Sequence, residues 1–273
     1  MWSRLIQHLK QRREDAAVAR KVIPDALWRR TLKRFPFLPR AGTPDEAALR
    51  RLSSLFLDRK EFSGAHGLEV TDDMAVAIAA QACLPVLGLH PSAYDGFVGI
   101  VVHPGLARAR RSFADDDGVV HEFDETLSGE AVHGGPIMLS WRDVRSAGAK
   151  ASQGYNVVIH EFVHVLDMAD GLADGTPLLP ADISRKEWAD TLLAAYEALC
   201  NAVDSDQDTA LDPYAAESLE EFFAVASEAF FVAPAALHNE HPAVYALFKR
   251  YFRQDPLGRA APAEEARGGL TQS

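Results

Sequence analysis

The residues with the clearest chemical potential are His160, Glu161 and His164, which form the pattern H-E-x-x-H. On a helix, positions i and i+4 lie on one face, so both imidazoles can bind one cation. Zinc suits two nitrogen ligands and leaves room for a third protein ligand and a water molecule. Glu161, next to the first histidine, can reach that water as a general base. The pattern therefore predicts a zinc-dependent hydrolase.

A catalytic zinc ion needs a third protein ligand, and two aspartates follow the motif closely. The metzincin extension of the motif requires glycine at position 167 and histidine at position 170. This chain has Asp167 and Asp170 there, so that class is excluded. Asp170 is itself a candidate ligand, whereas Asp167, one turn after His164, is a candidate partner for the proton of a ligand imidazole.

A later glutamate-rich segment offers a different third ligand, as in gluzincins, where a glutamate on a following helix completes the site. Glu217, Glu221 and Glu228 are spaced at i, i+4 and i+11 and share one face of the expected helix. Glutamates in such an apolar helix are paired, metal-bound or turned to solvent, and Glu220 is the expected solvent-facing member. Spacing alone does not separate Glu221 from Glu217, Glu228 or Asp170 as the third ligand.

The elements that must position these groups follow from capping residues and apolar periodicity. Thr43 before Pro44 and Thr71 before two aspartates are typical helix N-caps. The apolar pattern predicts strands at 97–102, 119–123 and 137–141, and helices at 47–57, 74–83, 149–168, 185–202, 215–232 and 243–253. Helices, then strands, then helices predict an α+β protein with a small mixed sheet and mostly helical N- and C-terminal parts.

Three segments are expected along the chain. Residues 1–60 form a helical N-terminal region packed on the core, residues 61–255 form the catalytic domain, and residues 256–273, rich in Ala, Gly, Pro and Glu, form a flexible tail. The strand at 137–141 precedes the metal-binding helix and is expected to be a sheet edge, where an extended peptide docks by main-chain pairing.

The charge and composition of the 273 residues exclude several classes of protein. The net charge of −11 argues against a dedicated nucleic-acid binder, although residues 1–60 alone carry +9 and the remainder −20. Two cysteines exclude a disulfide scaffold. No apolar run is long enough to span a membrane, and the first residues do not resemble a signal peptide, so we expect a cytoplasmic protein without membrane contact.

The blocks around the candidate site resemble a known family. Those carrying the resemblance are 154–167, 212–216 and 221–231, with further similarity at 35–38 and 135–141. They are similar to the zinc site and flanking segments of the Mlc titration factor A family, and the resemblance extends from about residue 20 to 255.

The resemblance implies a cytoplasmic bacterial zinc peptidase with aminopeptidase-type activity on small substrates. It implies a zincin-like (gluzincin) core similar to the last domain of anthrax lethal factor. By position, His160, His164 and Glu221 would hold Zn²⁺, Glu161 would be the base and Tyr214 would stabilise the oxyanion. The family also binds the glucose repressor Mlc and sequesters it from DNA, so an Mlc-like transcription factor is an expected partner besides a peptide substrate.

One alternative stays open. The chain would then be a non-enzymatic regulatory protein that sequesters a repressor, and its metal site would be vestigial or structural. A structural zinc site is usually closed by four protein ligands, whereas a catalytic site keeps one position for water. The number of protein ligands near His160 and His164 therefore distinguishes the two hypotheses.

Overall fold

The computed structural model describes residues 2–89, 91–105, 107–114, 120–127, 129–131 and 135–260, with the backbone alone for residues 2–7, 91, 260 and those between 107 and 131. The N-terminal helices are α1 (Trp2–Arg20), α2 (Asp25–Arg34), α3 (Pro44–Arg59) and α4 (Asp72–Cys83). The strands are β1 (Glu61–Gly64), β2 (Gly99–His103), β3 (Ala107–Ala114), β4 (Val120–Leu127), β5 (Gly129–Ala131) and β6 (Ile137–Ser140). The later helices are α5 (Trp141–Lys150), α6 (Val157–Asp167), α7 (Arg185–Asp204), α8 (Leu219–Val232), α9 (Pro234–Glu240), α10 (Pro242–Phe252) and α11 (Pro256–Ala260).

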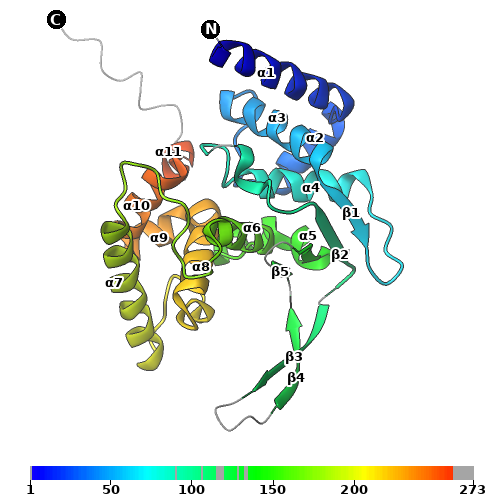
Figure 1. Ribbon diagram of the computed structural model, residues 1–273. Coiled ribbons are helices and arrows are strands. Elements are labelled where there is room, and N and C mark those ends of the chain that lie inside the picture. The colour runs from blue at the N-terminus through cyan, green and yellow to red at the C-terminus, as the bar shows by residue number, and fades with distance from the viewer. Residues whose placement is uncertain are drawn as a thin grey trace, which may run out of the picture.

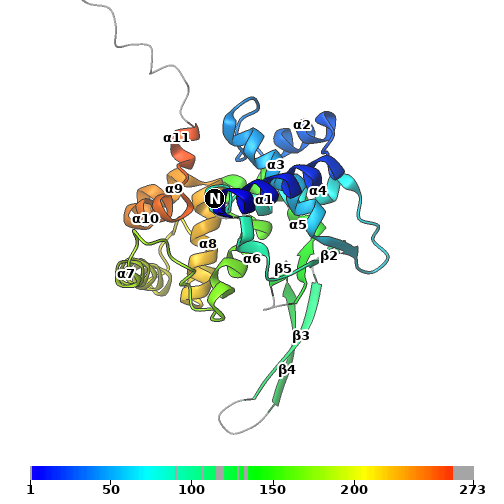
Figure 2. The same cartoon turned by 45° about the horizontal axis from the view of Figure 1, so that its top comes forward.

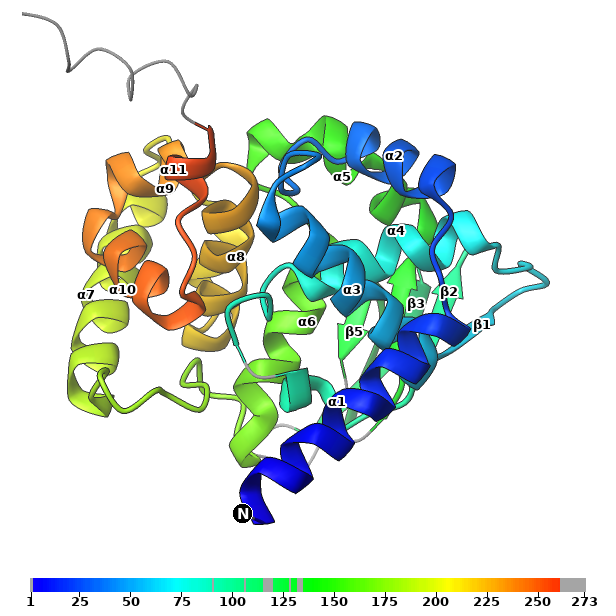
Figure 3. The same ribbon diagram turned by 90° about the horizontal axis from the view of Figure 1, so that it is seen from above.

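Helices α1–α3 lie on one side of the molecule and α7–α10 on the other, with α6 between them (Figure 1). Figure 3 shows α3 over α4, and α1 along the outside of α3. The predicted caps are confirmed, because the Thr43 hydroxyl accepts from the Glu46 amide and the Thr71 hydroxyl from the Met74 amide. The helices and strands of the described residues together confirm the α+β class.

The main sheet has the strand order β1-β2-β6-β5. Strands β1, β2 and β6 are parallel, and β5 pairs antiparallel with β6. The sheet is small and mixed, as predicted. The prediction that 137–141 is a sheet edge was wrong, because β6 lies between β2 and β5; the edge strand next to it is β5. The strand also ends at Ser140, whose hydroxyl caps α5 by accepting from the Asp143 amide.

The helix expected over 149–168 is not continuous. Its first two residues are the end of α5, and α6 forms only from Val157 onwards. Helix α5 ends at Lys150, a short 3₁₀ turn follows, and Gly154 has a left-handed φ of 77° that a continuing helix excludes. The Asn156 side chain then accepts from the Ile159 amide and begins α6.

The start of one later helix also differs from the prediction. The expected helix over 215–232 begins only at Leu219, after a 3₁₀ turn at Pro213–Ala216, because the Ser218 hydroxyl caps α8. The predicted end at residue 232 is confirmed, and Pro234 then occupies the first turn of α9, where its missing N–H costs nothing.

The weak alternation at 119–123 belongs to β4, which pairs antiparallel with β3 over Ala107–Ala114, a strand that the pattern did not predict. This hairpin projects away from the helices in two views (Figures 1 and 2). Of the segment expected to be a tail, residues 256–260 form α11, and residues 261–273 lie outside the described part of the chain.

Several basic residues of the first 60 positions form ion pairs with nearby carboxylates. Arg20 pairs with Asp58 at 2.7 Å and Arg51 with Asp15 at 2.8 Å, while Arg34 joins α2 to Asp73 of α4 at 2.8 Å. The first two pairs use aspartates already counted in the net +9 of residues 1–60, whereas the third draws on an aspartate outside that segment. Among the described helices, none is long and apolar enough to cross a membrane.

Candidate metal centre

Helix α6 carries both histidines and is buried on nearly all sides, so its packing determines where they point. Val158, Ile159, Phe162 and Val163 are fully buried, so the helix has a fixed rotation about its axis. Glu161 is 5% exposed and His164 is 8% exposed. Buried polar groups need hydrogen-bonding or oppositely charged partners. Here glutamates of α8 supply them.

Helix α8 packs against α6 and carries Glu221 in its first turn. The Ser218 cap sets where this turn begins, because its hydroxyl accepts from the Glu221 amide at 3.1 Å. The Glu221 side chain consequently points at the two histidines. It is the only carboxylate among the described residues that groups with both imidazoles as possible ligands of one ion.

Three ligand atoms converge on one point. The Nε2 atoms of His160 and His164 lie 3.1 Å apart, and Oε2 of Glu221 lies 3.2 Å from the first and 3.6 Å from the second. Zinc–ligand bonds of about 2.0–2.1 Å in a tetrahedron require ligand atoms about 3.3 Å apart. The buried Glu221 Oε2 has no hydrogen-bond partner among the described residues. The arrangement therefore fits a tetrahedral cation such as zinc.

The electrostatics of the cluster attract positive charge. Burial opposes charge on His160, but the neighbouring carboxylates of Glu221 and Glu228 raise its pKa well above the ordinary value. Burial likewise opposes ionisation of Glu221, yet the two histidines lower its pKa. Burial raises the pKa of Glu161 to about 7, against the pull of His160 and His164. A cation at this point would meet an ionised carboxylate and two nitrogen donors.

Glu228, two turns after Glu221 on α8, orients the first histidine from behind. Its Oε1 lies 2.8 Å from Nδ1 of His160, and its other oxygen accepts from the Asn156 amide at the start of α6. The Asn156 side chain in turn donates to Gln81 of α4 at 2.9 Å. Glu228 is 2% exposed, so this chain of contacts is shielded from water. A proton held on Nδ1 leaves Nε2 free to bind a metal ion.

The other sequence candidates for the third ligand lie elsewhere. Glu217 is exposed and precedes α8, because the helix begins later than predicted. Asp170 is exposed and pairs with Arg185 at 3.0 Å. Glu220, expected to face solvent, has an oxygen 3.6 Å from Nδ1 of His164. The structure thus groups only Glu221 with the histidine Nε2 atoms.

Tyr214 lies beside the cluster on the 3₁₀ turn that precedes α8. Its ring centroid is 6.2 Å from that of His160, and its side chain is 41% exposed. The Asp212 carboxylate accepts from the Tyr214 amide at 3.0 Å and fixes the turn. The Tyr214 ring therefore lies beside His160 and is partly open to solvent.

Comparison with known proteins agrees with this geometry. The model of the glucose-regulated metallo-peptidase M90 family matches residues 8–253. The chain belongs to this family. It is 37% identical over 82% of its length to Mlc titration factor A of Pectobacterium atrosepticum, covering 84% of that protein. It is also 37% identical to Mlc titration factor A of Serratia proteamaculans, over 86% of this chain and 89% of that one. An uncharacterized protein of Synechocystis sp., slr2042, is 32% identical over 82% of both chains.

In this M90 chain, Asp167 does not contact a ligand imidazole as the sequence suggested. Its Oδ2 accepts from the Gly175 amide at 2.9 Å, while the Gly175 carbonyl accepts from Trp188 Nε1 at 2.8 Å. Burial raises the pKa of Asp167 to about 7. Asp167 therefore fastens the segment after α6 to α7.

The role of Glu228 was missed by sequence reasoning in this M90 chain. The spacing of seven residues from Glu221 placed it on the correct face, but it appeared only as a competing ligand. The signal that could have revealed this role is Asn156. As the N-cap of α6, it has a backbone amide that needs an acceptor, and Glu228 of α8 supplies it. Only the packing of the two helices shows that one carboxylate serves both Asn156 and His160.

Proposed function

We propose that this chain is a zinc-dependent peptidase whose ion is held by His160, His164 and Glu221. The observation that carries the proposal is the convergence of three ligand atoms within 3.1 to 3.6 Å of one another, with Glu161 on the adjacent position of the same helix. Three protein ligands leave a fourth tetrahedral position for water, which is typical of catalytic rather than structural zinc sites. Membership of a metallo-peptidase family supports the same conclusion.

The architecture also supports a gluzincin-type core. Two histidines come from one helix and the glutamate from a later helix, with a small mixed sheet beside them. One edge of that sheet is β5, the strand that follows the β3–β4 hairpin. An extended peptide can pair with the free side of β5, which replaces the docking edge first expected at 137–141.

The chain's own residues then act as follows. A zinc ion bound here supplies Lewis acidity and lowers the pKa of a bound water molecule to about 7. Glu161 accepts the proton of the attacking water and passes it to the departing amine. Tyr214 donates a hydrogen bond to the carbonyl oxygen as negative charge develops on it. Glu228 keeps the proton of His160 on Nδ1.

The test is a pair of variants with separate readouts for metal content and turnover. Glu161→Gln is expected to retain stoichiometric zinc and to lose hydrolysis of amino-acid p-nitroanilides and short peptides by about a hundredfold or more. His160→Ala is expected to lose both. A Glu161→Gln protein with full activity would exclude Glu161 as the base, and chelator-resistant activity in the wild type would exclude the metal mechanism.

We further propose aminopeptidase-type specificity and binding of an Mlc-like repressor in the cytoplasm. The names of two relatives support the second point, because both are Mlc titration factors. Two free cysteines agree with a reducing compartment. Capture of a purified Mlc-type repressor by wild type and by Glu161→Gln separates the roles: equal capture by both shows that binding does not need catalysis. Failure of both to bind would refute the repressor proposal and leave the peptidase proposal standing.

A further inference from the structure

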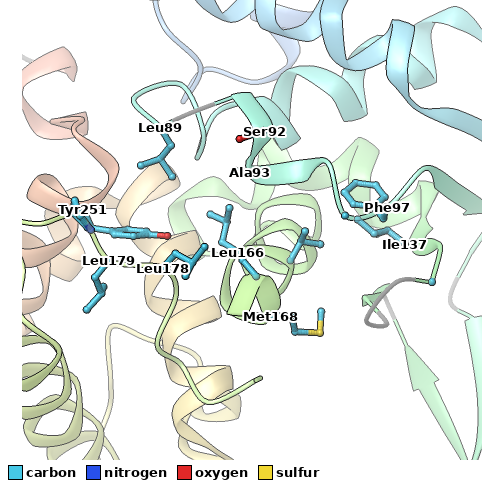
Figure 4. Close-up of a pocket in the computed structure, with 15 residues that line it drawn as sticks. Leu89, Ser92, Ala93, Phe97, Ile137, Leu166, Met168, Leu178, Leu179 and Tyr251 are labelled. Atoms are coloured by element: carbon cyan, nitrogen blue, oxygen red, sulfur yellow. The ribbon is translucent and has the colours of Figure 1, made fainter. Parts of the chain in front are cut away.

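An apolar cavity of about 520 Å³ lies at the C-terminal end of α6, outside the metal cluster. Figure 4 shows Tyr251 and Leu178 on one side of it, Phe97 and Ile137 on the other, and Met168 between them. Its volume lies within the range of about 300–1,000 Å³ that small-ligand pockets occupy. None of the roles described above uses this cavity.

The wall that contains Phe97 is held by a buried cation. Lys60, 9% exposed, donates from Nζ to the Tyr94 carbonyl at 2.5 Å and to the Phe97 carbonyl. The same ammonium lies 3.7 Å from the centroid of the Phe97 ring. Burial lowers the pKa of Lys60 to about 8. Because the buried ammonium donates to two backbone carbonyls, it holds the backbone of this wall in one conformation.

The opposite wall is fastened as firmly. Gly175, three residues before Leu178, is bound at its amide by Asp167 and at its carbonyl by Trp188. Its φ of +76° and the Leu219 carbonyl, 2.6 Å from where a Cβ would lie, confine the backbone to one path. Leu178 nevertheless leaves 61% of its surface exposed. The cavity is thus a preformed apolar site with an apolar residue at its open edge.

The cavity is continuous with the proposed path of a peptide in two ways. Val165, which lines it, follows Glu161 by four residues on the same face of α6, about 6 Å along the helix axis. Extended peptide advances about 3.3 Å per residue, so two residues cover that distance. Ile137, which also lines the cavity, pairs with Ala131, the last residue of the edge strand β5. A peptide that follows β5 towards Ala131 therefore reaches the cavity.

We propose that this cavity binds a bulky apolar side chain of the peptide substrate, located one or two residues from the scissile bond. The inference rests on the proposed peptidase function and adds a specificity determinant to it. A leucine or phenylalanine side chain fits the lining, which offers Ile137, Val165, Met168 and Leu178 as apolar contacts. A charged side chain there would lose its hydration without a charged partner among the lining residues.

The experiment measures kcat/KM of the zinc-loaded protein on fluorogenic alanine peptides in which leucine, phenylalanine or glutamate replaces one alanine at a time on both sides of the cleaved bond. We expect one position, one or two residues from the bond, where leucine or phenylalanine raises kcat/KM by at least about tenfold and glutamate lowers it. Calorimetric binding of the same peptides to metal-free protein is measured in parallel.

Three variants locate the effect. Ala93→Phe fills the cavity from its part-buried wall and is expected to abolish the apolar preference while all-alanine peptides are still cleaved. Leu178→Ala, at an exposed position that tolerates change, is expected to reduce the preference several-fold. Leu172→Ala is the matched control, because Leu172 is 58% exposed on the same segment but does not line the cavity.

The outcomes separate this inference from the proposed function. Cleavage with no apolar preference at any position, or with a preference that Ala93→Phe leaves intact, overturns the cavity assignment and leaves the peptidase standing. Absence of metal-dependent cleavage of every peptide overturns both. In that case, calorimetric binding of leucine peptides that Ala93→Phe removes would indicate that the cavity serves a free apolar ligand instead of a substrate.

Discussion

Replacing Glu228 by glutamine tests how the second helix prepares the metal site. The carboxylate accepts from two buried N–H groups, the His160 ring nitrogen Nδ1 at 2.8 Å and the Asn156 amide. Glutamine offers one oxygen and one NH₂ group, so it can accept from only one of them. If its oxygen faces Asn156, its NH₂ faces His160 and favours the tautomer with the proton on Nε2. That proton occupies the position through which the imidazole would bind a metal ion.

The magnitude follows from the same contacts. Loss of a buried outer partner of a metal-ligating histidine lowers metal affinity by about 10–100-fold, or about 1.4–2.8 kcal/mol. One unsatisfied buried N–H costs about 1–3 kcal/mol of folding free energy in the metal-free protein. Both losses are expected in Glu228→Gln, since the carboxylate serves the ligand and the helix start together.

The assay is zinc affinity by competition with a chromophoric chelator, with urea unfolding of the metal-free protein beside it. Glu217→Gln is the control, because Glu217 is an exposed glutamate just before α8. An affinity for Glu228→Gln within twofold of wild type, with unchanged stability, would refute the reasoning that Glu228 sets the His160 tautomer.

Two further predictions concern the segment after α6. Asp167 has a pKa raised from 3.8 to about 7, so it binds its proton more tightly in the folded than in the unfolded chain. The free energy of unfolding of the metal-free protein should therefore decrease as the pH rises from about 4 to 7, which means that the fold becomes less stable. Asp167→Asn keeps an acceptor for the Gly175 amide and should flatten that decline; urea unfolding at pH 5 and pH 8 checks it, and an unchanged pH slope contradicts it. Gly175→Ala should destabilise the fold by about 2 kcal/mol or more, because strain at φ +76° adds to contact with the Leu219 carbonyl. Gly171→Ala, at φ +96° with open space around it, should cost only about 1 kcal/mol, and equal losses in thermal unfolding would exclude the contact.

Local chemistry alone was enough to predict much of this protein. The histidine pair needs only the helical period of α6 to face one point, and Thr43 and Thr71 cap their helices through contacts three residues away. The order of helices and strands was enough to predict the α+β class. These features depend on neighbours in sequence, so the amino-acid pattern contains them.

Local patterns failed where backbone geometry interrupts an apolar run. Gly154 adopts a left-handed conformation that splits the expected long helix, and Ser218 starts α8 four residues later than the apolar pattern suggested. Strand 137–141 looked like an edge because pairing partners are not encoded in a strand's own alternation. Of its two neighbours, β5 lies close to it in sequence, but β2 lies on the far side of the β3–β4 hairpin.

The sequence by itself therefore determined the candidate ligand types, the spacing of the two histidines and the set of carboxylates that could complete a metal site. Only the tertiary structure decided among those carboxylates, since Glu221, Glu228 and Glu220 lie on one helix and differ in which imidazole nitrogen they approach. That choice depends on how α8 is rotated and shifted against α6. The packing of two buried helices sets this rotation through many apolar contacts distant in sequence, and no short motif records it.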